Sequence, residues 1–438
     1  MLEKLFGLKA NGTNVRTEVL AGFTTFMTMA YIVVVNPTIL GEAGMPVAAV
    51  AVATCLAAGF GSILMGLIAN YPLALAPGMG LNAYFTYTVV KGMGVPWEVA
   101  LGCVFLSGVA FLILTLVGVR QMIVAAIPKP LFSAVAAGVG LFIAFIGLKE
   151  AGIIVASPAT TVALGDLTTP SAALAIIGLL VIAVLQAWRV KGAILIGILL
   201  ATAAGWVLGL AKVIPATSSL ADLTATAFKL DILGAFHLKG GLALAMLEIV
   251  FVFLFVDLFD NVGTLVAVTK KAGLQAPDGS IPRLNRILLA DSAATMVGAV
   301  AGTSTVTSYI ESAAGVTAGG RTGLTAVVVG LLFLLTMFFA PLVQAIPAAA
   351  TAPALILVGA LMVGSLVDID WADPTVAIPA FLTLITIPLT FSIANGLAFG
   401  ITSYALLRLL TGKITKADWL LLVLAALFIL RFVYLAKG

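Results

Sequence analysis

Long apolar stretches run through this sequence, and they constrain its fold more than any other feature. They form two sets of seven, and each stretch is close to the length of about 20 residues that a helix needs to cross a bilayer. The first set lies near residues 20–40, 47–69, 72–90, 97–118, 130–148, 171–188 and 191–211, and the second near 243–269, 284–300, 302–317, 322–340, 351–366, 373–389 and 391–411. We therefore predict an all-α membrane protein with 14 transmembrane segments.

The composition supports a lipid environment. Hydrophobic residues make up 62% of the 438 residues and charged residues only 9%, whereas soluble domains carry about 25% charged residues. A soluble core could not bury this much apolar surface, so the lipid bilayer must act as the solvent. The net charge of +4 comes without any basic run, which argues against nucleic acid as a partner.

The basic residues indicate the orientation. With the N-terminus inside, fifteen Lys and Arg residues fall in inside segments and five in outside loops, as the positive-inside rule requires. We predict a multi-pass protein of the inner or plasma membrane in which both repeat termini are cytoplasmic. A further apolar piece, 417–435, either crosses again or lies along the inner surface.

The two halves of the chain resemble each other. Ala126-Ile-Pro128 stands 12 residues before Gly140, Ala345-Ile-Pro347 stands 12 residues before Gly359, and the two triplets are 345 − 126 = 219 residues apart. An odd number of spans in each half inverts the second half in the membrane, which is the usual construction of secondary transporters. We predict a 7+7 inverted repeat, with residues 412–438 as an appendage outside it.

The third span of each half is a poor helix. The first contains Pro77, Gly78 and Gly80, which remove a backbone donor and loosen the turn. The second, 302–317, alternates Thr and Val at its start, a pattern that favours an extended strand. Paired interruptions at matching positions point to a substrate site near the middle of the bilayer.

Acidic side chains lie in the spans close to these interruptions. Asp257 and Asp260 are three residues apart and therefore share one helix face, while Glu311 belongs to the second interrupted span. Because a charge inside the bilayer is costly, such residues are candidates for function. Asp260 and Glu311 are the strongest candidates; Glu248 and Asp291 are interpreted as structural.

The sequence does not indicate an enzyme. It has no G-x-S-x-G, H-E-x-x-H or Walker A motif, so we predict no catalytic residue and no cofactor. Cys55 and Cys103 lie in apolar stretches and are interpreted as packing residues, and a lone His237 cannot form a metal site. Without a nucleotide-binding domain, transport must be driven by a gradient.

At these motifs the chain resembles a nucleobase–cation symporter, specifically an AzgA-like purine permease of the nucleobase–ascorbate transporter superfamily. The motifs are Gly22-Phe-Thr-Thr-Phe-Met-Thr-Met-Ala-Tyr31 with Asn36-Pro37, Ala76-Pro-Gly-Met-Gly-Leu-Asn-Ala-Tyr-Phe85, Asp257-Leu-Phe-Asp260-Asn-Val-Gly-Thr264 and Thr307-Ser-Tyr-Ile-Glu311-Ser312. The resemblance covers nearly the whole chain. It departs from the family at Asp260, where members often have Glu, and at Asn261, where they commonly have Thr.

The resemblance implies a division into core and gate domains. The core would comprise residues 1–125 (spans 1–4) and 241–342 (spans 8–11), and the gate residues 126–240 (spans 5–7) and 343–411 (spans 12–14). It also implies short antiparallel strands in spans 3 and 10, and a homodimer formed through the gate domain.

The function that we predict is proton-coupled import of purine nucleobases, adenine or guanine/hypoxanthine, by alternating access. The two acids would hold the polar edge of the base, and an aromatic ring such as Phe26 or Tyr84 would stack on its face. The candidate substrate-binding residues are Asp260, Glu311, Phe26, Thr25, Gly80, Asn82, Tyr84 and Ser312. The coupled proton would be carried by Asp260, Glu311 or Asp257.

Two alternatives stay open. A uracil- or xanthine-type nucleobase carrier would share the same architecture and the same acids. An anion exchanger of this architecture should present a cationic or purely backbone site at the interrupted spans, and the acids found there argue against it.

Overall fold

The computed structural model describes residues 2–118, 128–210, 220–236, 243–276, 280–413 and 418–435. These residues are almost entirely helical, and the chain divides into two compact units. The first unit comprises Met1–Leu116 and Ile146–Leu357, and the second Val117–Phe145 and Val358–Gly438. The core and gate boundaries expected from the resemblance stay predictions, and two of them, at 125/126 and 240/241, lie outside the described residues.

The first unit holds most of the elements. Its α-helices are α1 (Leu2–Phe6), α2 (Val15–Met29), α3 (Ile32–Gly41), α4 (Val47–Leu64), α5 (Met79–Ala83), α6 (Trp97–Leu116), α9 (Pro170–Ala187), α10 (Ala193–Val207), α11 (Ile232–Phe236), α12 (Ala243–Ala272), α13 (Leu284–Ala301), α14 (Ser312–Thr317) and α15 (Gly323–Thr336). Its π-helices are η1 (Met65–Ala69) and η2 (Tyr84–Gly92), and its 3-10 helices are η3 (Leu220–Ala225) and η4 (Met337–Ala345). Its strands are β1 (Leu75–Pro77), β2 (Ile154–Ser157), β3 (Thr161–Leu164) and β4 (Val306–Ser308).

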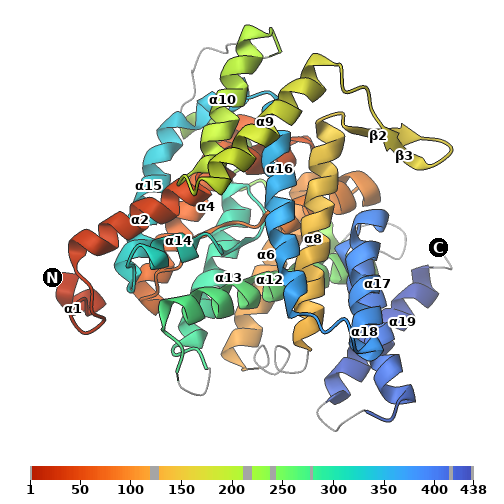
Figure 1. Cartoon of the computed structure of the whole chain (residues 1–438). Helices are drawn as coiled ribbons and strands as arrows, with labels where there is room; N and C mark the ends of the chain where they lie inside the picture. The colour runs from red at the N-terminus through yellow and green to blue at the C-terminus, as the bar shows by residue number, and fades with distance from the viewer. Residues whose placement is uncertain are drawn as a thin grey trace. The chain divides into compact units, whose positions relative to one another are not determined.

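The second unit contains a 3-10 helix and three α-helices: η5 (Gly364–Asp368), α17 (Pro374–Thr390), α18 (Ile393–Leu410) and α19 (Trp419–Leu435). Helix α17 packs along α18, and α18 also packs against α19 (Figure 1). Two further helices, α8 (Lys129–Glu150) and α16 (Ala348–Val363), belong partly to each unit. The apolar appendage expected at the C-terminus is therefore helical, and Phe432 of α19 contacts Phe399 with ring centroids 5.5 Å apart.

The lengths of the apolar helices agree with a multi-pass membrane protein. Within the described residues, nine helices are long and apolar enough to cross a membrane. The shorter apolar helices Ala193–Val207, Gly323–Phe339 and Pro374–Thr390 fall on three more of the expected spans. Two interrupted segments occupy the places of spans 3 and 10, and the total of 14 spans stays a prediction.

Both interrupted spans contain the strands that were expected. Strands β1 and β4 pair antiparallel, with Leu75 opposite Ser308, Ala76 opposite Thr307 and Pro77 opposite Val306. The ladder continues at each end, because Gly78 N donates to Thr305 O (2.9 Å) and Tyr309 N donates to Ala74 O (3.0 Å). Each broken span thus satisfies the backbone of the other, although paired residues such as Leu75 and Ser308 are 233 positions apart in the sequence (308 − 75).

The outer edges of this two-stranded sheet are also satisfied. Ser62 of α4 accepts from Leu75 N (2.9 Å) and donates to Leu75 O (3.1 Å). Thr295 of α13 does the same for Val306, with distances of 3.2 and 2.9 Å. Because lipid offers no hydrogen bonds to open sheet edges, these two hydroxyls allow the strands to exist at this depth.

Two glycines that the predicted repeat makes equivalent meet in the structure. Gly140 of α8 and Gly359 of α16, which the sequence pairs across the two halves, pack against each other. A Cβ on Gly140 would lie 2.7 Å from Gly359 O, and a Cβ on Gly359 would meet Gly140 O in return. The absence of side chains lets the two backbones touch, as small residues commonly do in membrane helices.

One buried acid joins the first and eleventh spans. Glu18 of α2 is fully buried. It accepts from Arg321 N (2.8 Å) and Thr325 Oγ1 (2.6 Å), near the start of α15. The sequence gives no local sign of this contact, because Glu18 stands in the polar opening segment and its partners are some 300 residues away.

The hairpin β2–β3 was not anticipated. It follows α8, pairs Ile154 with Leu164, and turns at residues 158–160; Thr161, the first residue of β3, has φ +68°. Its strands are largely exposed, and the hairpin projects beyond the helices that surround it in the first unit (Figure 1). Each strand has only four residues, so its alternation of apolar and polar side chains gives little periodic signal. The sequence pattern therefore does not distinguish the hairpin from an irregular loop.

Candidate functional site

The candidate site lies in the first unit, where the β1–β4 pair meets α12 and α14. Helix α12, which carries Asp260, packs against β4, α14 and α5. Glu311 stands directly before α14, so its position follows from the strand that precedes it. The pairing of β1 with β4 therefore places the two predicted acids on neighbouring elements, although they are 51 residues apart (311 − 260).

Glu311 is held by a tyrosine from the first span. The Tyr31 hydroxyl donates to Glu311 Oε1 at 2.6 Å. Tyr31 is fully buried and lies between α2 and α3, where the first span is interrupted. Tyr31 belongs to a sequence motif of the first span, but nothing in its local pattern indicates a partner 280 residues away.

Asp260 reaches the start of the first interrupted span. Its Oδ2 atom lies 3.7 Å from the point where a Cβ on Gly78 would stand, and Thr307 Cγ2 lies 3.0 Å from that point. Asp260 also lies within electrostatic range of Glu311 and of Asp291, a fully buried residue of α13 that was interpreted as structural. Three acids thus gather in this part of the unit.

The two predicted stacking residues differ in environment. Phe26 is half-buried and packs edge-on against Phe333, with centroids 5.2 Å apart. Tyr84 is 1% exposed and packs edge-on against Phe253 at 5.1 Å. Because only Phe26 keeps accessible ring surface, it is the better placed of the two for contact with a ligand.

Asn82 belongs to a buried polar network. Its Nδ2 donates to Asn36 Oδ1, and its Oδ1 accepts from Ser304 Oγ. Asn36 Nδ2 in turn donates to Thr54 Oγ1 (2.6 Å) and Thr303 Oγ1 (2.9 Å). The amide of Asn82 is therefore engaged with protein groups, and the network ties both interrupted spans to α3 and α4.

The remaining candidates lie around the same strands. Ser312 Oγ accepts from Ala74 N at 3.0 Å and so joins the two interrupted spans. Thr25 of α2 is fully buried against Gly315 of α14, and Gly80 is buried in α5. Asp257, the third proton candidate, is 2% exposed and lies one turn before Asp260 on α12. Ligand contacts of these residues stay predictions.

A second tyrosine was also missed. Tyr309 follows β4, is 5% exposed, and its hydroxyl donates to Pro77 O. This carbonyl belongs to the proline that breaks the first interrupted span. Tyr309 therefore helps to hold the broken backbone beside Asp260 and Glu311.

Among the described residues, no group of three or more His, Cys, Asp and Glu side chains is placed to hold a metal ion. Cys55 and Cys103 are buried and unpaired with each other, in agreement with their interpretation as packing residues. His237 lies outside the described residues.

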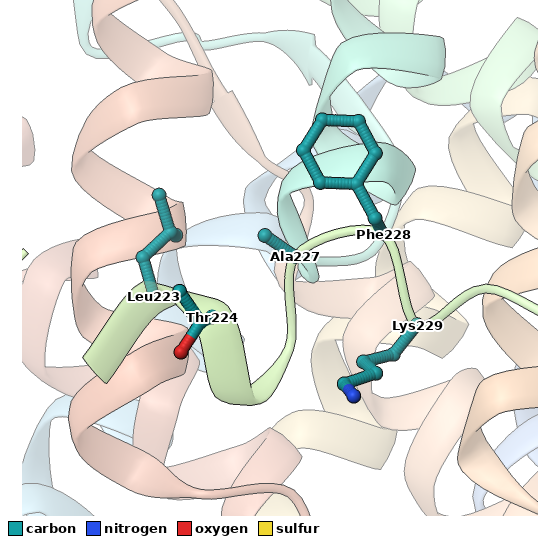
Figure 2. A pocket seen from close by; sticks show the side chains of 5 residues that line it. All are labelled: Leu223, Thr224, Ala227, Phe228 and Lys229. Atoms are coloured by element: carbon teal, nitrogen blue, oxygen red, sulfur yellow. The ribbon is translucent and has the colours of Figure 1, made fainter. Parts of the chain in front are cut away.

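A separate pocket of about 320 Å³ contains none of the predicted residues. Figure 2 shows its lining by Leu223, Thr224, Ala227, Phe228 and Lys229. Its segment is attached to the end of α13, because Phe228 N donates to Val300 O at 2.8 Å. The lining is mostly apolar and lacks paired polar groups that would orient a ligand.

Comparison with known proteins places the chain in a family. A family model described as a permease family matches residues 16–399. The chain is 54% identical to a putative permease of Methanocaldococcus jannaschii, with 99% of both chains covered. It is 48% identical to the adenine permease AdeP of Escherichia coli, covering 99% of this chain and 96% of the relative. It is also 45% identical to the guanine/hypoxanthine permease PbuG of Bacillus subtilis, covering 99% and 100%.

The fold is shared with solved transporters. The transmembrane domain of the cyanobacterial bicarbonate transporter BicA superposes with a TM-score of 0.60 over 94% of this chain and 97% of that domain, at 16% identity. This likeness confirms the predicted helical core-and-gate fold. At such low identity it says nothing of the substrate of this chain.

The network around Asn82 generates a prediction about stability. Asn82→Ala would leave Asn36 Oδ1 without its donor and Ser304 Oγ without its acceptor, and each buried unsatisfied group costs about 1–3 kcal/mol. We expect a clear fall in the thermal unfolding midpoint of the purified protein in detergent. Asn11→Ala, which removes an exposed amide bonded to Gly7 O, is the control and should change the midpoint little. An unchanged midpoint for Asn82→Ala would contradict the structural role.

Proposed function

The chain belongs to the permease family, and on that premise we propose that it imports purine nucleobases together with protons by alternating access. It is a multi-pass membrane transport protein, not an enzyme. The observation that carries the proposal is the gathering of Asp260 and Glu311 beside two paired, interrupted spans. We place the protein in the inner or plasma membrane with both repeat termini cytoplasmic.

Purines suit this site chemically. A purine is a flat ring with hydrogen-bond donors and acceptors on its edge, and carboxylates accept from ring N–H groups. Phe26 offers ring surface for stacking on the face of the base. The relatives named as adenine and as guanine/hypoxanthine permeases match the chain over nearly its full length, which supports purines over other flat rings.

Substrate class is tested by competition. We expect cells that lack their own nucleobase permeases to take up labelled adenine or labelled hypoxanthine when they express the wild-type chain. Unlabelled adenine, guanine or hypoxanthine should reduce that uptake, whereas uracil, xanthine and bicarbonate should leave it unchanged. Stronger competition by uracil or xanthine would favour the sister carrier, and bicarbonate transport without purine transport would favour the anion exchanger.

The two acids are tested one at a time. Asp260→Asn and Glu311→Gln should each lower labelled purine uptake at least about tenfold, because a hydrogen bond to a charged group contributes about 1.5–3 kcal/mol. A protonophore should abolish accumulation in the wild type. Asp368→Asn, which changes an exposed acid of η5, is the matched control. Unchanged accumulation in either site variant would remove that acid from the proposal, and unchanged accumulation in both would leave Asp257 as the remaining candidate for the coupled proton.

Alternating access requires contacts between core and gate that break during transport. The Tyr87 hydroxyl donates to Glu150 Oε1 at 2.9 Å. The resemblance assigns span 3, with Tyr87, to the core and α8, which ends at Glu150, to the gate, although both residues lie in the first compact unit. Lys91 and Glu42 form an ion pair of 2.5 Å on the same side, and Lys91 Nζ lies 5.4 Å from the Tyr87 ring. Within the proposal, this contact closes the outer side of the carrier.

Linking these two positions should therefore stop transport. In a Tyr87→Cys, Glu150→Cys double variant, a short bifunctional thiol reagent is expected to block purine uptake, because the core can no longer move against the gate. Each single variant treated in the same way should keep its uptake, since Cys55 and Cys103 are buried. Normal uptake by the cross-linked double variant would contradict movement at this contact.

A homodimer through the gate domain is part of the same proposal and rests on the family resemblance. The mass of the purified protein in a defined detergent tests it directly.

A further inference from the structure

Strand β4 has two chemically different faces. Val306 belongs to an apolar cluster with Leu75 and Ala294. Because successive side chains of a strand point to opposite faces, Thr305 and Thr307 face away from that cluster. The ladder hydrogen bond from Gly78 N to Thr305 O keeps this segment extended as far as Thr305.

The face that carries Thr307 meets Asp260. Thr307 Cγ2 lies 3.0 Å from the point where a Cβ on Gly78 would stand, and Asp260 Oδ2 lies 3.7 Å from the same point. Gly78 has φ −76° and ψ 119°, which any residue can adopt. Glycine is therefore required here by the lack of room for a side chain and not by the backbone conformation. The threonine and the acid thus come together over a glycine.

The hydroxyls on this face have no partner. Thr305 Oγ1 and Thr307 Oγ1 are both buried without a hydrogen bond to any described residue. Two neighbours before them are satisfied: Thr303 Oγ1 accepts from Asn36 Nδ2 at 2.9 Å, and Ser304 Oγ donates to Asn82 Oδ1. Ser308 Oγ, on the face of β4 that carries Val306, is also buried without a hydrogen bond to a described residue. Buried polar groups in native proteins are nearly always satisfied, so two unsatisfied hydroxyls on one strand face, one of them beside the partly buried Asp260, require an explanation.

We propose that the Thr305 and Thr307 hydroxyls bind acceptor nitrogens on the edge of the transported base, beside Asp260. This inference rests on the proposed function and deepens it. An ionised carboxylate only accepts hydrogen bonds, whereas a hydroxyl also donates one. The acids therefore serve the N–H groups of a nitrogen heterocycle, and the hydroxyls serve its unprotonated ring nitrogens, which the acids cannot bind while ionised.

The substitutions that test this are isosteric. Thr307→Val and Thr305→Val each remove one hydroxyl and keep the shape, and we expect each to raise the KM for purine uptake by about tenfold. Because the removed hydroxyl has no protein partner, the unfolding midpoint should not fall. Thr307→Ser keeps the hydroxyl and should keep much of the affinity. Thr115→Val, which removes a buried hydroxyl bonded to Phe111 O in α6, should leave the KM unchanged.

Purine analogues identify the contact itself. In 3-deazaadenine and 7-deazaadenine, a C–H group replaces one acceptor nitrogen. A site built to hydrogen-bond that nitrogen rejects the analogue, so the wild type should bind at least one of the two less well than adenine in competition assays. The Val variant that removes the responsible hydroxyl should bind this analogue and adenine equally.

Two results would overturn the inference while leaving the proposed function intact. In the first, the wild type takes up purines, and both Val variants keep the wild-type KM and the wild-type discrimination against the analogues. In the second, both Val variants have a lower unfolding midpoint with unchanged discrimination, which would assign the hydroxyls to the fold. Failure of the wild type to transport any purine would instead contradict the proposed function.

Discussion

The structure depends on how broken backbone is satisfied inside a bilayer. Hydrocarbon offers no hydrogen bonds, so an interrupted span must find partners in protein. Here β1 and β4 supply each other with partners, and Ser62 and Thr295 complete the two outer edges. Removing either interruption would leave the other with unpaired N–H and C=O groups. The two halves of the repeat therefore depend on each other at the site.

This mutual dependence explains why the functional groups converge. The strand pair brings Gly78 next to Thr307, and α12 places Asp260 over that junction. Glu311 follows β4 by three residues and meets Tyr31 at the break in the first span. Because Gly78 has no side chain, Thr307 and Asp260 both lie close to it, with Thr307 Cγ2 3.0 Å and Asp260 Oδ2 3.7 Å from the point where its Cβ would stand. The interruption is thus the means of building the site rather than a defect in a helix.

Sequence patterns predicted the interrupted spans and the acids of the candidate site, but not the contacts that these residues make. Pro77 and Gly78 predicted the break in the first span, and the Thr/Val alternation predicted extended backbone in the second, because these signals act locally. The strand pair was implied by the family resemblance, and the scarcity of acids in lipid singled out Asp260 and Glu311. The Tyr31–Glu311 contact and the Glu18 contacts join residues about 300 positions apart, and no local pattern encodes them. Asn82 was expected at the substrate, yet its amide is bonded to Asn36 and Ser304. A buried amide has the same sequence signal in either role, so only its tertiary partners distinguish them.

The distinction between purines requires more than two acids. Adenine presents an amino donor where guanine and hypoxanthine present a carbonyl acceptor, and the neighbouring ring nitrogen changes from acceptor to donor. An ionised carboxylate accepts hydrogen bonds only from the donors of either base, so it cannot form a hydrogen bond with the acceptors of the base. Groups that both donate and accept are needed beside it, and Thr305 and Thr307 are such groups without other partners in the described chain. Relatives that resemble this chain to a similar degree are named for adenine and for guanine/hypoxanthine. This agrees with a choice of base made by a few hydrogen bonds on a common frame.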